Sequence, residues 1–371
     1  MSTWDCVFLL LCAAFYLRVG GAQEGFISLD YGASDGTSYK SDIGLFYTSD
    51  GSYISSGSKK LPSIHKELLQ FGPLNFGLEI YSPTFLHVWE LRRLDNATHV
   101  LRTEIIKIAT STSLSVCLLK TNNSMPFISG LELRPYNGIY SPENGSSLVT
   151  FKRIDFGSTK ESRFPADPYD RIWTPDYNAY GTPISTDLQV KEVYDKRFGL
   201  PTAIMQTAVT SSAPITISWT TSASIYIFLH FAELIEYKGN QTRNLSITKN
   251  GETWLDTLVA RYLVSNTAYS TSPDTVVCYS FSINVTQTST LGPIINAIEI
   301  YEAREVTGSS TNQQDVDAIT GVRDFYSLKK NWISDPCLPL NYPWDGLACG
   351  YENPSSPRII SLCATLISCF L

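Results

Sequence analysis

Hydrophobic and polar residues alternate along much of the chain in short runs, and one of these runs occurs twice. Residues 293–301 read as a proline, two apolar residues, two small or polar residues and then apolar-Glu-apolar, and residues 126–133 follow the same order. The last three of these positions alternate in each copy as they do in a strand with one buried face. The repeat therefore predicts two half-buried strands in equivalent places.

A second matching run precedes each copy. The first is Leu-Asp-Tyr-Gly at residues 29–32, and the second is Ile-Asp-Phe-Gly at residues 154–157. Two landmarks in the same order predict two related β units. The first unit is 42 positions shorter, because Asp30 and Pro126 are 126 − 30 = 96 positions apart whereas Asp155 and Pro293 are 293 − 155 = 138 apart.

Further strand-like runs fill both units and are separated by turn-forming residues. They lie at residues 25–30, 43–47, 104–109, 114–119, 215–219, 225–231, 244–247 and 279–285. Many short strands with little helix predict an all-β fold of the sandwich type. Residues 315–328 differ, because apolar residues recur there at helical intervals, and we expect Asp315 to cap this helix.

Composition narrows the class of protein. A chain of 371 residues is long enough for two or three domains. The 21 tyrosines and 17 phenylalanines favour strands over helical bundles. The net charge of −7 argues against a nucleic-acid partner, because phosphate binding needs a basic face.

The N-terminus predicts export. Residues 7–17 form a short apolar core and residues 20–22 are small, which is typical of a signal peptide ending at Ala22. The alternative is a buried N-terminal helix. No run reaches the roughly 18–20 apolar residues that a membrane span needs. Glycosylation motifs of the Asn-X-Ser/Thr type support the secretory route, at Asn96, Asn122, Asn144, Asn240, Asn244 and Asn284.

Cysteine spacing predicts a disulfide and no metal site. Eight cysteines occur, two of them inside the predicted signal peptide. None of the other six forms a CxxC pair, so a zinc site is not expected. Cys337 and Cys349 flank a Pro- and Trp-rich stretch with few core residues of its own, and in an oxidising compartment we expect them to pair. Two free thiols are the alternative.

The C-terminal stretches resemble the cap that begins a leucine-rich repeat array in plant receptor kinases. They are residues 315–319, 330–332, 335–337, 344–347 with Cys349, and 357–362. Residues 25–30, 167–173, 205–209 and 230–234, together with the two landmark strands, look like the malectin-like ectodomain of the same family. The resemblance implies tandem malectin-like β-sandwiches, the first shortened, followed by a small helical cap. The implied boundaries are 1–22 signal peptide, 23–140 first unit, 141–306 second unit and 307–371 cap.

The chain departs from this family pattern in three places. Tyr31 stands where the family usually has a cysteine. Residues 70–89 replace a longer stretch of the first unit that includes core strands. After Leu362 the sequence ends without repeats, a membrane span or a kinase. We therefore expect a truncated or mis-spliced receptor product, with a dedicated secreted protein as the alternative.

The resemblance implies a non-catalytic recognition module without a cofactor, outside the cell or at the plasma-membrane surface. Its expected partner is a cell-wall saccharide, a secreted peptide or a membrane co-receptor. A stand-alone secreted lectin or decoy is an alternative, and a wall-active hydrolase is an alternative of another class. Glycan binding without turnover would exclude the hydrolase.

Candidate chemistry in the sequence is weak. Residues 155–157 spell the kinase triplet Asp-Phe-Gly and residues 32–36 spell a Gly-x-Ser-x-Gly elbow, but neither has its supporting motifs, and a strand followed by a turn is the better interpretation. Asp167 and Asp170 are interpreted mainly as turn residues beside a paired Arg171, with a calcium or sugar site as the alternative.

A sugar site needs an aromatic face and polar groups that fix the hydroxyls. The turn-rich opening of the first unit offers both, so the predicted ligand-binding residues are Tyr31, Tyr39, Tyr47, Asp50 and Tyr53. Alternating tyrosines also pack on sheets, and this alternative stays open.

Overall fold

The protein is described from a computed structural model. The structure describes residues 25–52, 78–79, 84–94, 97–107, 113–114, 128–136, 140, 147–192, 196–304, 310–328, 330, 332, 335–338, 343–352 and 356–362. The predicted signal peptide, Tyr53 and the acceptor residues Asn96, Asn122 and Asn144 lie outside these residues.

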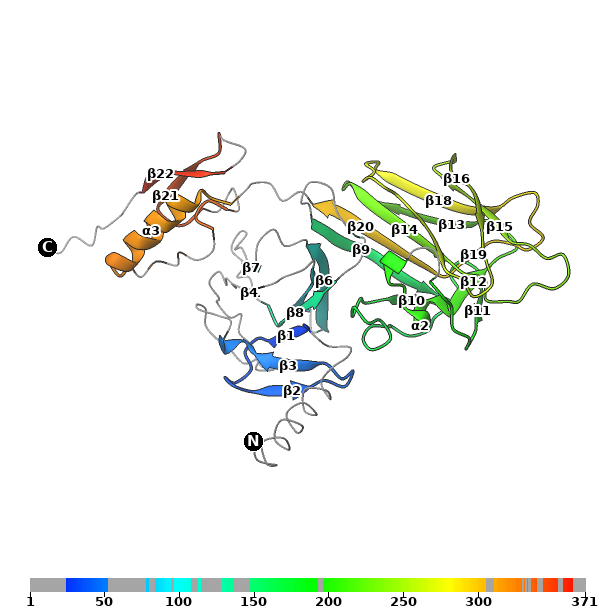
Figure 1. Cartoon of the computed structure of the whole chain (residues 1–371), viewed down its shortest axis with the longest axis horizontal. Helices are drawn as coiled ribbons and strands as arrows, with labels where there is room; N and C mark the ends of the chain where they lie inside the picture. The colour runs from blue at the N-terminus through cyan, green and yellow to red at the C-terminus, as the bar shows by residue number, and fades with distance from the viewer. Residues whose placement is uncertain are drawn as a thin grey trace, which may run out of the picture.

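Strands dominate the described residues, which confirms the predicted all-β class (Figure 1). The first half of the chain contributes β1 (Ile27–Asp30), β2 (Ser38–Lys40), β3 (Phe46–Ser49), η1 (Asp50–Ser52), β4 (Leu78–Glu79), β5 (Thr84–Leu94), β6 (Ala97–Lys107), β7 (Ser113–Leu114), β8 (Gly130–Pro135), β9 (Ser147–Phe156), β10 (Thr174–Asp176) and β11 (Thr182–Ser185). The rest contributes η3 (Lys196–Phe198), α2 (Thr202–Met205), β12 (Thr207–Thr210), β13 (Ile215–Thr220), β14 (Ile225–Phe231), β15 (Asn244–Lys249), β16 (Glu252–Val259), β17 (Asn266–Tyr269), β18 (Cys278–Val285), β19 (Ile294–Ile295), β20 (Ala297–Arg304), α3 (Gln313–Phe325), β21 (Leu347–Gly350) and β22 (Arg358–Leu362).

One large sheet runs through both units. Its path is β17-β14-β20-β9-β6-β5-β8-β1-β3-β2, with β10 paired to β9, which makes 11 strands. The units join where β6 pairs with β9 through the partners Ile105–Val149 and Ile106–Leu148. The two landmark strands take equivalent central places as β8 and β20 (Figure 1). Backbone hydrogen bonds therefore join the two units into one continuous sheet.

A second sheet completes a sandwich in the second unit. Its order is β13-β18-β15-β16, and a short sheet of β11, β12 and β19 lies beside it. Alternate residues of β13 and β18 point inward, as in Ile217 and Phe281, and meet Leu229 of β14 in one core cluster. Strict alternation on β13 and β18 gives them one buried and one outer face.

The landmark strands are buried on both faces, so the prediction of half-buried strands is wrong. Residues 297–301 of β20 and 130–134 of β8 are all buried. A second layer of side chains, which includes Tyr140 and Phe198, covers the face of β14 and β20 that points away from the sandwich core. Local alternation could not reveal this layer, because it comes from distant parts of the chain.

The C-terminal region is a separate small assembly of α3 with the β21–β22 hairpin (Figure 1). The helix is capped by Asn312, whose side-chain oxygen accepts from the Gln314 amide at 3.1 Å, and not by Asp315 as expected. Trp332 and Trp344 stack with ring centroids 5.6 Å apart and form its core with Ile319. No helix in the described part of the chain is long and apolar enough to cross a membrane.

Candidate functional site

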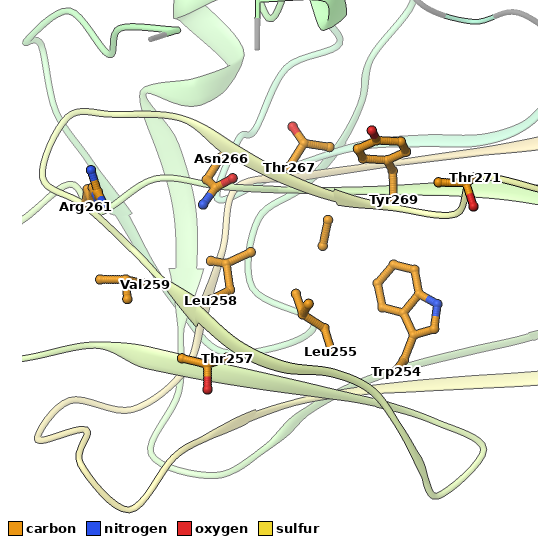
Figure 2. A pocket seen from close by; sticks show the side chains of 11 residues that line it. Trp254, Leu255, Thr257, Leu258, Val259, Arg261, Asn266, Thr267, Tyr269 and Thr271 are labelled. Atoms are coloured by element: carbon orange, nitrogen blue, oxygen red, sulfur yellow. The ribbon is translucent and has the colours of Figure 1, made fainter. Parts of the chain in front are cut away.

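A groove opens at one edge of the second unit, between β16 and β17 (Figure 2). These are the terminal strands of their two sheets, so among the described residues no further strand closes the sandwich there. The groove has a volume of about 680 Å³, within the range of small-ligand sites. A second hollow of about 280 Å³ shares Trp254, Tyr269 and Thr271 with it, and we call the two together the edge groove.

One aromatic ring lines the inside of the edge groove. Trp254 of β16 lies at one end and Arg261 lies at the other (Figure 2). Tyr269 of β17 borders the groove, but its ring packs on the opposite face of the sheet, where it stacks on Phe228 with centroids 6.0 Å apart. Apolar side chains of the sandwich core, Leu258 and Ala268, line the space between the walls. The Trp254 ring is held edge-on against Phe281, with centroids 5.2 Å apart. Packing on the core of the second unit thus fixes the position of the Trp254 ring.

Polar groups around the rings are available for hydrogen bonds. Within the described residues, the Trp254 indole N–H, the Tyr269 hydroxyl and the side chains of Asn266 and Thr271 have no hydrogen-bond partner. Thr267 differs, because its hydroxyl contacts Nδ1 of His230 at 2.9 Å. The edge groove therefore offers both donors and acceptors beside apolar surface.

Charge in the lining of the edge groove is sparse. Lys249 and Asp274 form an ion pair of 2.6 Å at the end beyond the rings. Arg261 is the remaining charged residue among those that line it. Chemically, the arrangement offers the Trp254 ring, apolar surface and neutral hydrogen-bonding groups.

Sequence reasoning missed Trp254 and Tyr269 because it predicted neither β16 nor β17. A usable signal was present for β16. Asn250 and Gly251 adopt positive φ values of 51° and 86° in the turn between β15 and β16, and Asn-Gly between apolar alternations is a strong hairpin signal. No comparable signal marks β17.

The structure brings only part of the predicted tyrosine cluster together. Tyr39 and Tyr47 stack with centroids 5.4 Å apart, and the Tyr39 hydroxyl donates to Asp30 at 3.0 Å. Burial and the nearby Asp30 raise the pKa of Tyr39 to about 12. Tyr39 is 49% exposed, whereas Asp50 is 2% exposed and the Tyr31 hydroxyl is buried. Tyr39 is therefore accessible to a ligand and Asp50 is buried, and the ligand-binding role of the five predicted residues stays a prediction.

The landmark residue Glu299 is the centre of a buried ion network. This network lies on the face of β20 that points away from the sandwich core. The Glu299 carboxylate lies 2.9 Å from Arg153 Nε and 3.2 Å from His230 Nε2, and accepts from the hydroxyl of Tyr140. Burial alone would raise the pKa of Glu299, but Arg171, the hydrogen bond from His230 and Arg153 outweigh it and hold that pKa well below its usual value. Burial lowers the pKa of His230.

The same network fixes the segment that follows β9. Asp167 accepts from Arg171 Nε and from the Trp173 indole N–H, each at 2.7 Å. The pairing of Arg171 with Asp167 confirms the interpretation of Arg171 as a paired residue, and Trp173 is fully buried beside it. Arg153 also pairs with Glu104 of β6, so the network crosses from the second unit into the first.

The equivalent landmark residue Glu132 is buried in a similar way in the first unit. Arg163 lies 2.7 Å from Glu132 and 2.6 Å from Asp170, and Arg134 lies 2.7 Å from Asp170. Two carboxylates and two guanidinium groups balance in formal charge there. Arginine pairing thus accounts for Asp170, as it does for Asp167. These residues position the two units and do not face the edge groove.

The two sequence matches to catalytic motifs, at residues 155–157 and 32–36, lie where a strand or turn is formed. Strand β9 ends at Phe156, and Gly157 follows with φ of 82°, as predicted for a strand and turn. After Ser34 the chain enters strand β2, whereas a nucleophile elbow leads into a helix. Both observations favour the structural interpretation made from the sequence.

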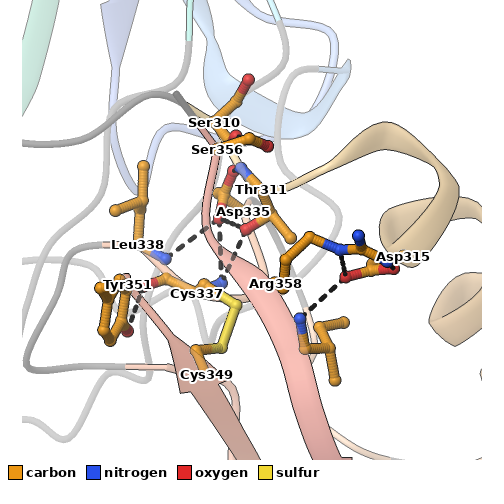
Figure 3. Close-up of a disulfide and its surroundings, with 11 residues drawn as sticks. Ser310, Thr311, Asp315, Asp335, Cys337, Leu338, Cys349, Tyr351, Ser356 and Arg358 are labelled. Carbon is orange, nitrogen blue, oxygen red and sulfur yellow. Dashed lines mark hydrogen bonds and ion pairs between the residues drawn. A yellow bond between two sulfur atoms is a disulfide. The ribbon is translucent and has the colours of Figure 1, made fainter. Parts of the chain in front are cut away.

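Cys337 and Cys349 form a disulfide in the C-terminal assembly (Figure 3). Asp335 accepts from the backbone amides of Thr311 at 2.7 Å and Cys337 at 2.9 Å, which fixes the entry to the disulfide. Arg358 donates to both carboxylate oxygens of Asp315, at 2.8 and 2.9 Å, and ties β22 to α3.

Three predicted acceptor asparagines lie among the described residues. Asn240 is exposed in a turn. Asn244 and Asn284 are half-buried on neighbouring strands β15 and β18. Glycosylation at all six motifs stays a prediction.

The comparisons with known proteins agree with this architecture. Residues 81–303 match the Malectin-like domain family. Two Arabidopsis thaliana relatives align over nearly the whole chain. The probable LRR receptor-like serine/threonine-protein kinase At1g05700 is 34% identical, with 98% of this chain and 49% of the relative covered. The LRR receptor-like serine/threonine-protein kinase IOS1 is 31% identical, with 97% and 46% covered. The chain spans about half the length of these curated relatives.

Solved structures share the fold at low sequence identity. The ANX2 ectodomain of Arabidopsis thaliana superposes with a TM-score of 0.60 at 14% identity, covering 76% of this chain and 97% of that chain. A structure of the plant peptide RALF23 in complex with FER and LLG2 matches with a TM-score of 0.58 at 13% identity, covering 76% and 96%. With the family match over more than half of its residues, the chain belongs to the malectin-like domain family, and its relatives include plant leucine-rich repeat receptor-like kinases.

Proposed function

We propose that the chain is a non-catalytic recognition module that acts outside the cell as the ligand-binding region of a receptor-like kinase. The observation that carries this proposal is the alignment of almost the whole chain with one half of such kinases. The edge groove adds a surface suited to binding. The module recognises a cell-wall saccharide, a secreted peptide or a co-receptor.

A peptide or co-receptor partner has support from a structural neighbour. That neighbour is a complex of FER with the peptide RALF23 and with LLG2, and it shares the fold of this chain. The ion networks around Glu132 and Glu299 support this role physically, because they join the two units with fully buried side chains. Two units held in one orientation can present a composite surface to a partner without a large ordering cost.

The proposed organisation follows the boundaries expected from the sequence. A signal peptide covers residues 1–22, the first unit 23–140 and the second unit 141–306. Residues 307–371 include a leucine-rich repeat N-terminal cap, supported by the packing of α3 on the β21–β22 hairpin and by the disulfide. The proposed glycans sit at the six acceptor asparagines.

The first unit is proposed to lack an internal segment that relatives retain. The alignment with At1g05700 extends over 417 residues, which exceeds the 371 of this chain, and the alignment with IOS1 extends over 412. The shorter landmark spacing of the first unit supports a missing segment between Asp30 and Pro126.

Binding without turnover tests the recognition function. The secreted full chain is incubated with a panel of wall oligosaccharides and secreted peptides, and complexes are measured by surface plasmon resonance. Released reducing ends and new amino termini are measured in parallel. Saturable binding with no product is the expected result. Product release at a rate above that of heat-denatured protein would identify an enzyme and overturn the proposal.

A further inference from the structure

We propose that the chain associates with a second copy of itself, through antiparallel pairing of strand β13 with β13 of that copy about a two-fold axis. This inference goes beyond the proposed recognition function, which concerns other partners. It starts from the place of β13 at the end of the sheet β13-β18-β15-β16, where one side of its backbone has no neighbouring strand among the described residues.

The open edge of β13 carries a row of unpaired backbone groups. In an antiparallel pair, residues alternate between those whose N–H and C=O groups face the partner strand and those whose groups face away. The Thr221 amide donates to the Val277 carbonyl at 3.1 Å, just beyond the end of β13, so the odd-numbered residues of β13 bond to β18. The even-numbered residues turn their N–H and C=O groups to the open edge, and all of them are exposed. They are Thr216, Ser218 and Thr220.

The three other terminal strands along the paths of the 11-stranded and four-stranded sheets are protected against such pairing. The pairing of β16 with β15 is interrupted by two register shifts, and β16 carries Glu252 and Asp256. Strands β2 and β17 have only three and four residues, and β2 ends at Lys40. Bulges, charges and short length all reduce edge-to-edge pairing. Strand β13 has none of these features, because its six residues are uncharged and keep an uninterrupted register with β18.

The spacing of the unpaired groups favours a second copy as the partner. The three outward-bonding residues are centred on Ser218. A two-fold axis at Ser218 would therefore place this residue opposite Ser218 of the second copy, and Thr216 opposite Thr220 of that copy. Every N–H of the row then meets a C=O, and the same surface serves both copies, as in an isologous dimer.

The side chains on the outer face of β13 suit the same pairing. Within one copy their hydroxyls already pair with β18, since Thr216 donates to Ser282 at 3.2 Å and Ser218 to Ser280 at 3.1 Å. Hydroxyl side chains opposite one another stabilise neighbouring strands, whereas like charges opposite one another destabilise them. A strand that pairs with its own copy must have no charge at the axis, and Ser218 meets this requirement.

This dimer would leave the edge groove accessible. Strand β16 lies at the other end of the same sheet, so pairing at β13 does not cover it. The acceptor residues Asn244 and Asn284 lie on β15 and β18, away from the open edge of β13. Self-association and ligand recognition would therefore use different surfaces.

Sedimentation velocity of the full secreted chain, over a series of micromolar concentrations, measures the association. A species of twice the monomer mass is expected to grow with concentration. Hydrogen exchange in the peptide that contains β13 is expected to slow in parallel, because pairing shields amides that face solvent in the monomer. Exchange in β14 is expected to stay unchanged, because β14 lies between β17 and β20.

A charge at the axis tests the symmetric pairing. Ser218→Lys places like charges opposite one another and is expected to weaken dimerisation by about fivefold or more. Thr253→Lys adds the same charge to an exposed position of β16, at the other edge of the sheet, and is expected to leave dimerisation unchanged. An equimolar mixture of the Ser218→Lys chain and a Ser218→Asp chain is expected to restore the dimer, because opposite charges then face one another. Thermal unfolding of each variant shows whether it is folded.

A chain that stays monomeric at all concentrations would overturn the proposal. So would a dimer that Ser218→Lys leaves unchanged, or one that the mixture of variants does not restore. Cys278 is an exposed free cysteine, so a denaturing gel without reductant is run in parallel, and a dimer found only in covalent form would make a disulfide the link. Capture of an extended peptide by a monomeric chain, lost in Ser218→Lys, would make a foreign strand the occupant. The recognition function is measured separately by ligand binding and survives each of these outcomes.

Discussion

The two units begin from the same landmarks and end with different architectures. The second unit closes a core between two sheets, with side chains such as Ile217 and Phe281 facing Leu229. In the first unit, the described strands extend one large sheet, with the short β4–β7 pair as the other sheet. Even so, Glu132 and Glu299 are both fully buried among arginine side chains. The shared feature of the repeat is therefore the ion-paired glutamate, which does not depend on a complete sandwich.

The largest expected effect comes from Glu299→Gln. This change removes one carboxylate partner from each of the buried residues Arg153 and Arg171, which keep Glu104 and Asp167, and breaking a buried pair costs about 3–5 kcal/mol. Chemical denaturation of the second-unit transition measures the loss. Glu302→Gln is the matched control on the same strand, because its partner Arg304 is 61% exposed and the expected loss is below about 1 kcal/mol.

Glu132→Gln tests whether the two units open separately. Its expected effect is local to β8 and to the contact of Glu132 with Arg134 of the first unit and Arg163 of the second, so hydrogen exchange of β8 is expected to accelerate while that of β14 does not. Equal acceleration in β8 and β14 would mean that the shared sheet unfolds as one cooperative body. The two units could then not be treated as separately stable.

The second unit is expected to lose stability as pH rises, because of Asp155. Burial raises the pKa of Asp155 to about 7, although hydrogen bonds from Thr207 and Ser158 act in the opposite direction. The folded state therefore binds more protons than the unfolded state between the ordinary carboxyl pKa and about 7, so stability falls across this window.

Asp155→Asn is expected to remove this slope, so that the variant gains on the order of 2–4 kcal/mol relative to the unaltered chain between pH 4.5 and pH 8. Urea denaturation at several pH values measures it, with Asp256→Asn, an exposed carboxylate on β16, as the control. A parallel pH dependence in the unaltered chain and Asp155→Asn would contradict the assignment.

Gly157→Ala tests the turn that follows the second landmark. Its Cβ would lie 2.4 Å from the carbonyl oxygen of Ala208, in addition to the strain of a positive φ. Gly251→Ala has a nearly equal φ of 86° but nothing within 4 Å. We expect Gly157→Ala to reduce the unfolding free energy by about 2 kcal/mol more than Gly251→Ala. Equal losses would show that the backbone near Ala208 moves aside.

The smallest effect is expected in the first unit. Tyr39→Phe removes one exposed hydrogen bond to Asp30 and keeps the stacking on Tyr47, so stability should change by about 0.5 kcal/mol or less. Oligosaccharide titration of the same variant tests the tyrosine cluster as a ligand site. A loss of affinity in this variant would support the tyrosine cluster as a ligand site, and unchanged affinity would count against it.

Much of the backbone could be predicted from the sequence, because strand state depends on local alternation and turn residues. The predicted run 225–231 coincides with β14, and the predicted run 244–247 lies within β15. The candidate site could not be predicted in the same way. Trp254 of β16 and Asn266 of β17 are twelve positions apart in sequence (266 − 254), and they line one groove only because β16 and β17 are the end strands of different sheets.

The sequence by itself determined the repeated landmarks, the all-β class, the C-terminal helix and the cysteine pair, since each follows from short-range pattern or from a small number of candidates. Tertiary structure decided how many layers cover each strand and which strand edges stay open. Burial of Glu132 and Glu299, the joining of both units through β6 and β9, and the edge groove are all such results. They depend on contacts between distant segments, which local alternation does not encode.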